Sequence, residues 1–411
     1  MKAKPLPIKV GVGAAALAVA LTACGSSSSG GANANSSSGP TSSASTGATD
    51  ASASTAASLR AGLDELFREH VDLTGFVVQT AVQKGISSAN TTQALNTLDK
   101  NTQALAAAVG SVYGASAQQQ FLKMWRAHIG FFVTYTKGLA TKDQSMVATA
   151  QHQLAGYKAQ FSKFLGTATD IPASAIANEL QGHIQTLEAA IRAIVASSPS
   201  AASKLQMAAM HMDGTAQALA AGIDQQKNLA GNADGDAASL RAALTGLLLQ
   251  HVAQTAAVVQ TAVGTSLSSP QTKAALSALD DNTVGLGKAI GSLYGGSAQQ
   301  QFLKMWRAHI GFFVTYTAGL AGHDQAMVRQ AQGQLANYKR DFARFLGPAT
   351  GLPAAAVSKD LQGHITTLEA AIKAIVAGNP DAAARLSMAE SHMAGTAAVL
   401  ASAITKQQHL S

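Results

Sequence analysis

Ser116–Thr136 reads SAQQQFLKMWRAHIGFFVTYT, and Ser297–Thr317 repeats this run without a single change. The offset of 181 residues then holds without a gap across the first copy, from Leu59 to Ile223, and its counterpart. A period this long corresponds to a whole domain, since solenoid repeats are only ~20–50 residues long. The chain of 411 residues therefore contains one domain twice.

Within each copy, apolar residues recur every three or four positions, which is the period of an α-helix. Alternating strand patterns are rare, and Gly114 separates two of the apolar runs. Short connections between helices favour antiparallel neighbours. The sequence therefore predicts an all-α fold, two tandem copies of an up-and-down bundle of about six helices each. In the first copy the six apolar stripes are Leu59–Val77, Leu95–Val112, Phe121–Tyr135, Val147–Phe164, Leu180–Ile194 and Leu205–Leu219.

The beginning of the chain resembles the export signal of bacterial lipoproteins. A basic start precedes the apolar stretch Val10–Ala20, which is too short to span a bilayer because spanning needs ~20 apolar residues. The stretch ends in Leu21-Thr22-Ala23-Cys24, which resembles a lipobox. The resemblance implies removal of residues 1–23, acyl chains on Cys24 and anchoring to the extracytoplasmic face of the cell membrane. Several acyl chains on one residue anchor stably, whereas a single chain binds only marginally.

Composition divides the remaining chain into four parts. Residues 24–57 are almost wholly Ser, Gly, Ala, Thr and Asn, so we expect a flexible tether. Helical copies are expected at 58–229 and 239–411, with a short polar joint at 230–238 between them. Cys24 is the only cysteine, so the copies contain no disulfide.

The charge of the chain argues against a nucleic-acid partner. Lys2, Lys4 and Lys9 leave with the signal, which has no acid, so the formal charge of +7 falls by three to +4. The remaining basic residues are scattered and form no stripe interleaved with aromatic residues. We therefore expect the membrane as a partner through the Cys24 lipid, with an extracytoplasmic protein partner left open.

Four histidines of each copy lie on the apolar stripes of four different helices. The other three histidines of the chain have no counterpart in the other copy, which suggests surface positions. Four separate buried imidazoles would each need a hydrogen-bond partner or cost roughly 1–3 kcal/mol. Convergence on one ion removes that cost. We therefore predict one buried ligand site per copy, formed by His70, His128, His183 and His211 and by His251, His309, His364 and His392.

The sequence leaves the ligand of these histidines open. Met207 and Met388 lie one helical turn before His211 and His392, and a Met–His pair favours copper, with zinc as the alternative metal. Haem b held by two histidines is a rival, with aromatic residues of the 21-residue run at its faces. A di-iron centre is disfavoured, because it needs carboxylates and Asp99, with its counterpart Asp280, is the one duplicated acid placed to turn inward.

Both copies are similar to an uncharacterised helical domain of secreted Gram-positive proteins. The similarity consists of the Glu/Gln-His-Val start, the Trp-x-x-His-Ile-Gly-x-Phe-Val segment and a His-Met near the end. No activity is established for that domain, so the resemblance adds little about function. No nucleophile–base pattern or phosphate-binding loop appears in the sequence, and we do not expect an enzyme. We expect a binding lipoprotein that stores, buffers or delivers its ligand. The alternative is a purely structural or interaction protein whose histidines are core residues.

Overall fold

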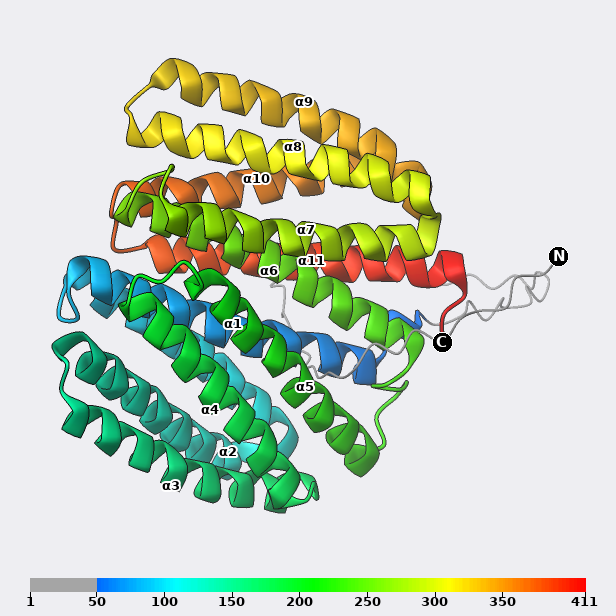
Figure 1. Ribbon diagram of the computed structural model, residues 1–411. Helices are drawn as coiled ribbons and strands as arrows, with labels where there is room; N and C mark the ends of the chain where they lie inside the picture. Colours follow the sequence, from blue (N-terminus) through cyan, green and yellow to red (C-terminus); the bar gives the residue numbers. More distant parts are fainter. Residues whose placement is uncertain (1–49) are drawn as a thin grey trace, which may run out of the picture.

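The computed structural model describes residues 50–411, and every regular element in this range is helical (Figure 1). A short 3-10 turn, η1 (Ala51–Ala53), precedes the first long helix. The first half of the chain forms α1 (Thr55–Lys84), α2 (Ala89–Thr141), α3 (Gln144–Thr169), α4 (Ala173–Val195) and α5 (Ala201–Lys227). The second half forms α6 (Asp236–Gly264), α7 (Pro270–Tyr294), α8 (Gly296–Ala321), α9 (Gln325–Thr350), α10 (Ala354–Val376) and α11 (Ala382–Gln408).

Helix α2 covers two of the predicted helices, joined across Gly114. This glycine has φ 84° and ψ 173°, so the helical path breaks there although the hydrogen-bonding continues on both sides. Its counterpart Gly295 has φ 86° and ψ 171° and separates α7 from α8. The two halves therefore have the same six helical segments, and the prediction of tandem all-α bundles is confirmed.

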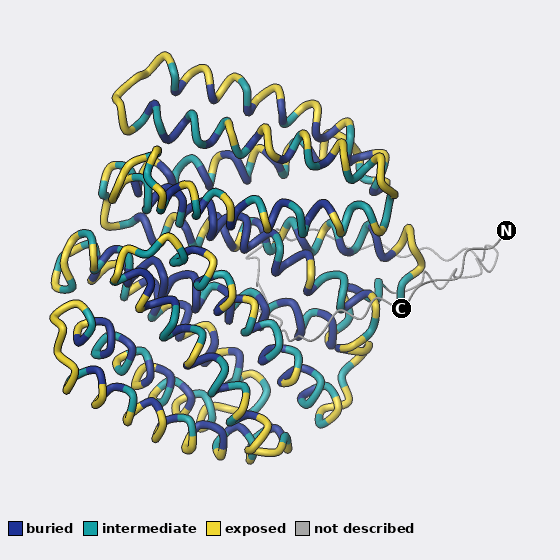
Figure 2. The backbone as a smooth tube through the Cα atoms, in the orientation of Figure 1, coloured by how far each residue is buried: buried dark blue, intermediate teal, exposed yellow. Residues whose placement is uncertain are grey.

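Helices that follow one another in the chain pack side by side in each half, as the short connections predict. Figure 2 shows how burial follows this arrangement: α1 and α6 are buried along most of their length, whereas α3 and α9 expose their outer faces. Helix α1 is buried on most sides because it contacts α2, α4 and α5 of its own half together with α6 and α11 of the other.

Helix α6 is the one helix of the described range that is long and apolar enough to cross a membrane, with a mean hydropathy of 1.4 over its best window. However, 83% of that window is buried inside the protein. Its apolar composition is that of a core helix enclosed by α1, α7, α10 and α11.

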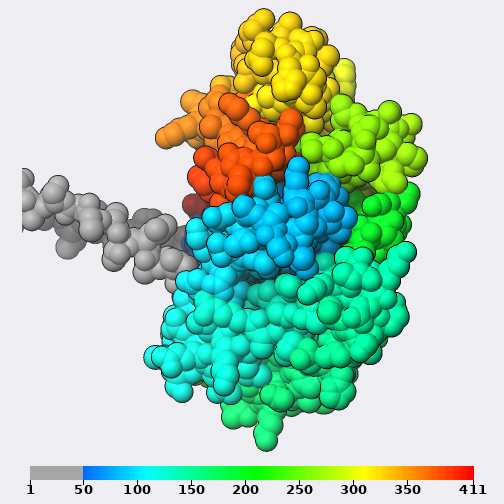
Figure 3. All heavy atoms as spheres, turned by 90° about the vertical axis from the view of Figure 1, so that its left-hand side faces the viewer, coloured from blue at the N-terminus to red at the C-terminus, as the bar shows by residue number. Residues whose placement is uncertain are grey.

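The two halves pack against each other through α1 and α6, and α1 also contacts α11. In Figure 3 the blue atoms of the first half lie directly beneath the orange to red atoms of the second. Arg60 of α1 donates to Ser239 Oγ at 3.1 Å, and its counterpart Arg241 of α6 donates to Ser58 Oγ at 2.9 Å. Ser239 is the counterpart of Ser58, so the two hydrogen bonds are exchanged between the halves. This reciprocity gives the junction an approximate two-fold symmetry.

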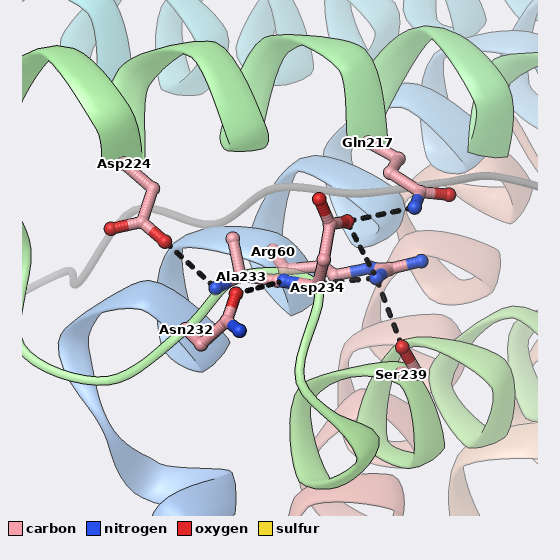
Figure 4. A network of polar contacts seen from close by, with 7 residues as sticks. All are labelled: Arg60, Gln217, Asp224, Asn232, Ala233, Asp234 and Ser239. Carbon is pink, nitrogen blue, oxygen red and sulfur yellow. Dashed lines mark hydrogen bonds and ion pairs between the residues drawn. The ribbon is translucent and has the colours of Figure 1, made fainter.

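The segment between the halves is held by side chains of the first half (Figure 4). Arg60 also donates to the carbonyl of Ala233 at 3.0 Å, and the amide of Ala233 donates to Asp224 at 2.8 Å. Gln217 donates to Asp234 at 2.8 Å. Helix α5 ends at Lys227 and α6 begins at Asp236, so the connecting segment covers residues 228–235.

The predicted signal 1–23, Cys24 and most of the predicted tether 24–57 lie outside the described residues. The last part of the tether range is ordered in the structure. Helix α1 begins at Thr55, where Ala56 and Ala57 are buried, and Asp50 pairs with Ser402 and Lys406 of α11. Residues 50–57 of the predicted tether range therefore belong to the described structure.

Candidate metal centre

Three imidazoles meet in the core of each half. In the first half they come from α1, α2 and α4, and in the second half from α6, α8 and α10. One ring nitrogen of each residue lies within 4.8 Å of a ring nitrogen of both others. All six side chains are buried, and none is more than 3% exposed. The first triad is His70, His128 and His183, and the second triad is His251, His309 and His364.

The helical period places each of these histidines on a core-facing stripe. His128 lies three residues after Trp125 and four before Phe132, and all three are buried. His70 follows Phe67 on the buried face of α1, and the hydroxyl of Thr74 donates back to the His70 carbonyl at 2.7 Å. The second half repeats this last bond between Thr255 and His251 at 2.8 Å.

Two nitrogens of each triad are close enough to share one ion. His70 Nε2 lies 3.4 Å from His128 Nε2, and His251 Nε2 lies 3.3 Å from His309 Nε2. A metal with tetrahedral angles and bonds of about 2.0–2.1 Å holds its donor nitrogens about 3.3–3.4 Å apart. The observed separations therefore equal those of ligands to a single ion.

Hydrogen bonding within the protein does not account for these imidazoles. The Nδ1 atom of His70 has no hydrogen-bond partner among the described residues, and neither ring nitrogen of His183 has one, whereas His128 contacts the backbone of Trp125. The second triad repeats this pattern in His251, His364 and His309, with Trp306 in place of Trp125. Without an ion, an Nε2–H···Nε2 hydrogen bond between two rings would give partners only to these two Nε2 atoms of each triad. Each remaining buried nitrogen would cost roughly 1–3 kcal/mol.

Aromatic rings enclose the first triad on several sides. Trp125 meets His128 edge to face at a centroid distance of 4.5 Å, and Tyr157 stacks on the same imidazole at 5.0 Å. Trp306 and Tyr338 repeat these contacts around His309 at 4.5 and 4.8 Å. The sequence placed Tyr157 only within the apolar stripe Val147–Phe164, and Tyr338 is its counterpart in the second half. Their duplication was the signal that could have placed them beside the site.

Burial keeps the triad imidazoles neutral. It lowers the pKa of His70 well below the ordinary value, and the nearby rings of His128 and His183 lower this pKa further. Burial also lowers the pKa of His183 to about 3, with a smaller effect of His211, and His364 has the same value. Neutral imidazoles are the form that binds metal, so at neutral pH the triads need no deprotonation before they bind.

The predicted fourth histidine of each site lies elsewhere. His211 Nε2 donates to the backbone carbonyl of Glu179 at 2.9 Å, and His392 Nε2 donates to that of Asp360 at 3.0 Å. Neither belongs to a triad, because the next residue on each helix, Met212 or Met393, occupies the core-facing position. The prediction of four converging histidines is thus corrected to three.

The predicted methionine ligands also point away from the triads. Met207 is 52% exposed and Met388 is 58% exposed, so both lie on the surface. Asp99 pairs with Arg126 at 2.6 Å and its counterpart Asp280 pairs with Arg307 at 2.7 Å, at exposed positions. Among the described residues, the clusters of three or more histidine, cysteine or acidic side chains with converging ligand atoms contain histidine alone.

A largely apolar cavity borders the first triad. Its volume is about 130 Å³, and its lining includes Trp125, His183 and Met212. A second cavity of about 30 Å³ reaches His70. Pockets that take drug-sized ligands or cofactors measure ~300–1,000 Å³, so these spaces are too small for haem.

Comparison of the chain with family models, with curated proteins and with solved structures found no match. The function must therefore be argued from the site itself.

Proposed function

We propose that each triad binds one transition-metal ion and that the chain is a membrane-anchored extracytoplasmic metal-binding lipoprotein. The observation that carries this proposal is the pair of Nε2–Nε2 separations, 3.4 Å and 3.3 Å, within buried histidine groups in which His183 and His364 have no hydrogen-bond partner among the described residues. It is supported by the occurrence of the same arrangement in both halves.

Copper, as Cu(I), is the ion that suits the triads best. Imidazole is a suitable ligand for both copper and zinc, so the ligand type alone does not choose between them. No carboxylate belongs to either group, so the charge of the ion would stay uncompensated in the core. Burying charge is costly, and a monovalent ion costs less than a divalent one. Zinc is the alternative, and we do not propose haem because the adjoining cavities are too small.

Buried sites of this kind are suited to binding and retaining an ion rather than to catalysis. The triad side chains are at most 3% exposed, and the larger adjoining cavity is apolar, so a polar substrate has no open approach. With the lipid anchor implied by Leu21-Thr22-Ala23-Cys24, the role would be storage, buffering or delivery of the ion outside the cell membrane.

The test is the metal content of the full-length protein, purified in detergent and measured by elemental analysis after dialysis against a weak chelator. His70→Phe should lower the retained copper or zinc by one ion per chain, and His70→Phe with His251→Phe by two. The control variant changes the exposed, unduplicated His152 and His323 to Phe and should retain both ions. Folding of each variant is checked by circular dichroism.

An unchanged metal content in the double triad variant would refute the proposal. So would a wild-type protein that takes up neither copper nor zinc when titrated. Either result would support the alternative, a structural or interaction protein in which the two Nε2 atoms share a hydrogen bond. An absorption spectrum with a haem band would contradict the choice of ligand.

A further inference from the structure

Methionine dominates the exposed apolar surface next to His211 and His392. Three of the six large apolar side chains exposed in the described range are methionines, and all three lie on α5 or α11. Met207 is 52% exposed, Met210 53% and Met388 58%. Side chains this exposed contribute little to the core, so packing does not explain them.

Each of these helices pairs an exposed methionine with a histidine one turn later. Met207 and His211 lie four residues apart on α5, and Met388 and His392 lie four residues apart on α11. Residues at this spacing share a helix face, with Cβ atoms ~5–6 Å apart. A helical side chain also leans toward the turn before it, and here that turn carries the methionine.

Both imidazoles are held in the orientation of a metal ligand. A carbonyl oxygen only accepts, so His211 Nε2 must carry the proton in its bond to Glu179, and the neutral ring has its lone pair on Nδ1. Metal-binding histidines are commonly fixed in this way, with one ring nitrogen donating to a carbonyl. The side chain is 25% exposed, and no described residue hydrogen-bonds to Nδ1.

The surroundings of the two imidazoles are alike although the sequences differ. A Cβ at Gly182 would lie 2.4 Å from the His211 ring, and a Cβ at Gly363 would lie 2.4 Å from the His392 ring, so each ring needs the glycine beside it. A carboxylate oxygen lies 3.8 Å from Nε2 in both halves, from Glu179 in one and from Asp360 in the other. The position of the carboxylate beside Nε2 is therefore the same in both halves, although glutamate is replaced by aspartate.

We propose that Met207 with His211, and Met388 with His392, form surface sites for a soft monovalent cation, Cu(I), through Sδ and Nδ1. Thioether ligands select Cu(I), and imidazole suits it as well. The first site gains a second thioether from Met210, where the second half has Ser391. These sites share no residue with the triads, and the inference does not depend on metal binding there.

The direct test uses the full-length protein labelled with carbon-13 at the methionine methyl groups. Silver(I), a redox-inert substitute for Cu(I), is added to one ion per pair. The methyl resonances of Met207, Met210 and Met388 should shift, whereas those of the buried Met212 and Met393 should not. Single changes to leucine assign the resonances. Unmoved surface resonances would overturn the proposal.

A graded test uses the difference between the halves. Met210→Ser should weaken Cu(I) binding at the first site to the level of the second, and Ser391→Met should strengthen the second, as measured by competition with a coloured Cu(I) chelator. Equal affinities in these two variants and the wild type would contradict the role of Met210. Loss of all Cu(I) in the His70→Phe, His251→Phe protein would assign the metal to the triads alone and overturn the surface sites.

Discussion

His183 is the histidine of the first triad with the fewest hydrogen bonds, so it has the most to gain from a bound ion. It is 3% exposed, and neither of its ring nitrogens has a hydrogen-bond partner among the described residues. A buried polar atom without a partner costs roughly 1–3 kcal/mol. Metal binding would satisfy one of the two nitrogens, so the metal-free protein bears the larger cost. His364 is in the same position in the second half.

Replacing His183 by phenylalanine should therefore stabilise the metal-free protein by about 1–3 kcal/mol while it removes metal from the first half. The ring of phenylalanine fills a similar space among Phe132 and the other aromatic residues. Urea unfolding in the presence of a chelator measures the free energy of unfolding. A loss of stability would indicate that His183 is a satisfied core residue.

The sequence identified the triad residues but could not exclude His211. On the last helix of the copy, His211 and Met212 both fit the apolar stripe, because adjacent helical residues differ by only ~100°. The structure places Met212 in the core, with 2% exposed, and turns His211 to the rim. That choice depends on how α5 is rotated against α4, which periodicity alone does not determine.

At the scale of helices, Gly114 and Gly295 decide the path of the chain before each 21-residue run. Both have a positive φ, which L-residues rarely adopt. The sequence predicted six helices from their apolar stripes, and these are confirmed. It could not show that the backbone would continue through Gly114 as one helix with a break, because the break depends on a single pair of dihedral angles.

Gly114→Ala should cost about 1–2 kcal/mol in the free energy of unfolding, because an L-residue is strained at this φ. A Cβ there would meet no atom within 4 Å, so the expected loss comes from the backbone alone. Gly130→Ala is the matched control: Gly130 lies inside the same helix with open space around its Cβ position. This control should stabilise by about 0.5–1 kcal/mol. Equal effects of the two changes would contradict the argument.

At the scale of the whole molecule, the two sides of the junction between the halves differ in charge. Helix α1 presents Glu65, Glu69 and Asp72, whereas α6 has Gly246, Gln250 and Ala253 at the corresponding positions. Glu390 of α11 is 1% exposed, and both its carboxylate oxygens lack a hydrogen-bond partner. Burial raises the pKa of Glu390 well above its ordinary value, and the charges of Asp72, Glu69 and Glu65 raise this pKa further.

Glu390→Gln should stabilise the protein, and by more at pH 8 than at pH 5. The folded state binds the Glu390 proton more tightly than the unfolded state, so this residue's contribution to stability falls as pH rises above the ordinary carboxyl pKa. The neutral amide removes that dependence. We expect a gain of about 1–3 kcal/mol at pH 8, measured by urea unfolding at both pH values.

The exposed Asp281 provides the control for this pH dependence. Asp281→Asn should leave the difference in stability between pH 5 and pH 8 as it is in the wild type. A Glu390→Gln protein with the same difference would show that Glu390 does not titrate in this range.

The exchanged bonds from Arg60 to Ser239 and from Arg241 to Ser58 have a consequence for partner choice. Because the junction has an approximate two-fold axis, each half contacts the other with nearly the same surface that it would use to pair with a second copy of itself. Two first halves would then bring Glu65, Glu69 and Asp72 of both chains into one buried seam, where like charges repel. A first half therefore prefers a second half, and the short joint makes the one in its own chain the nearest available.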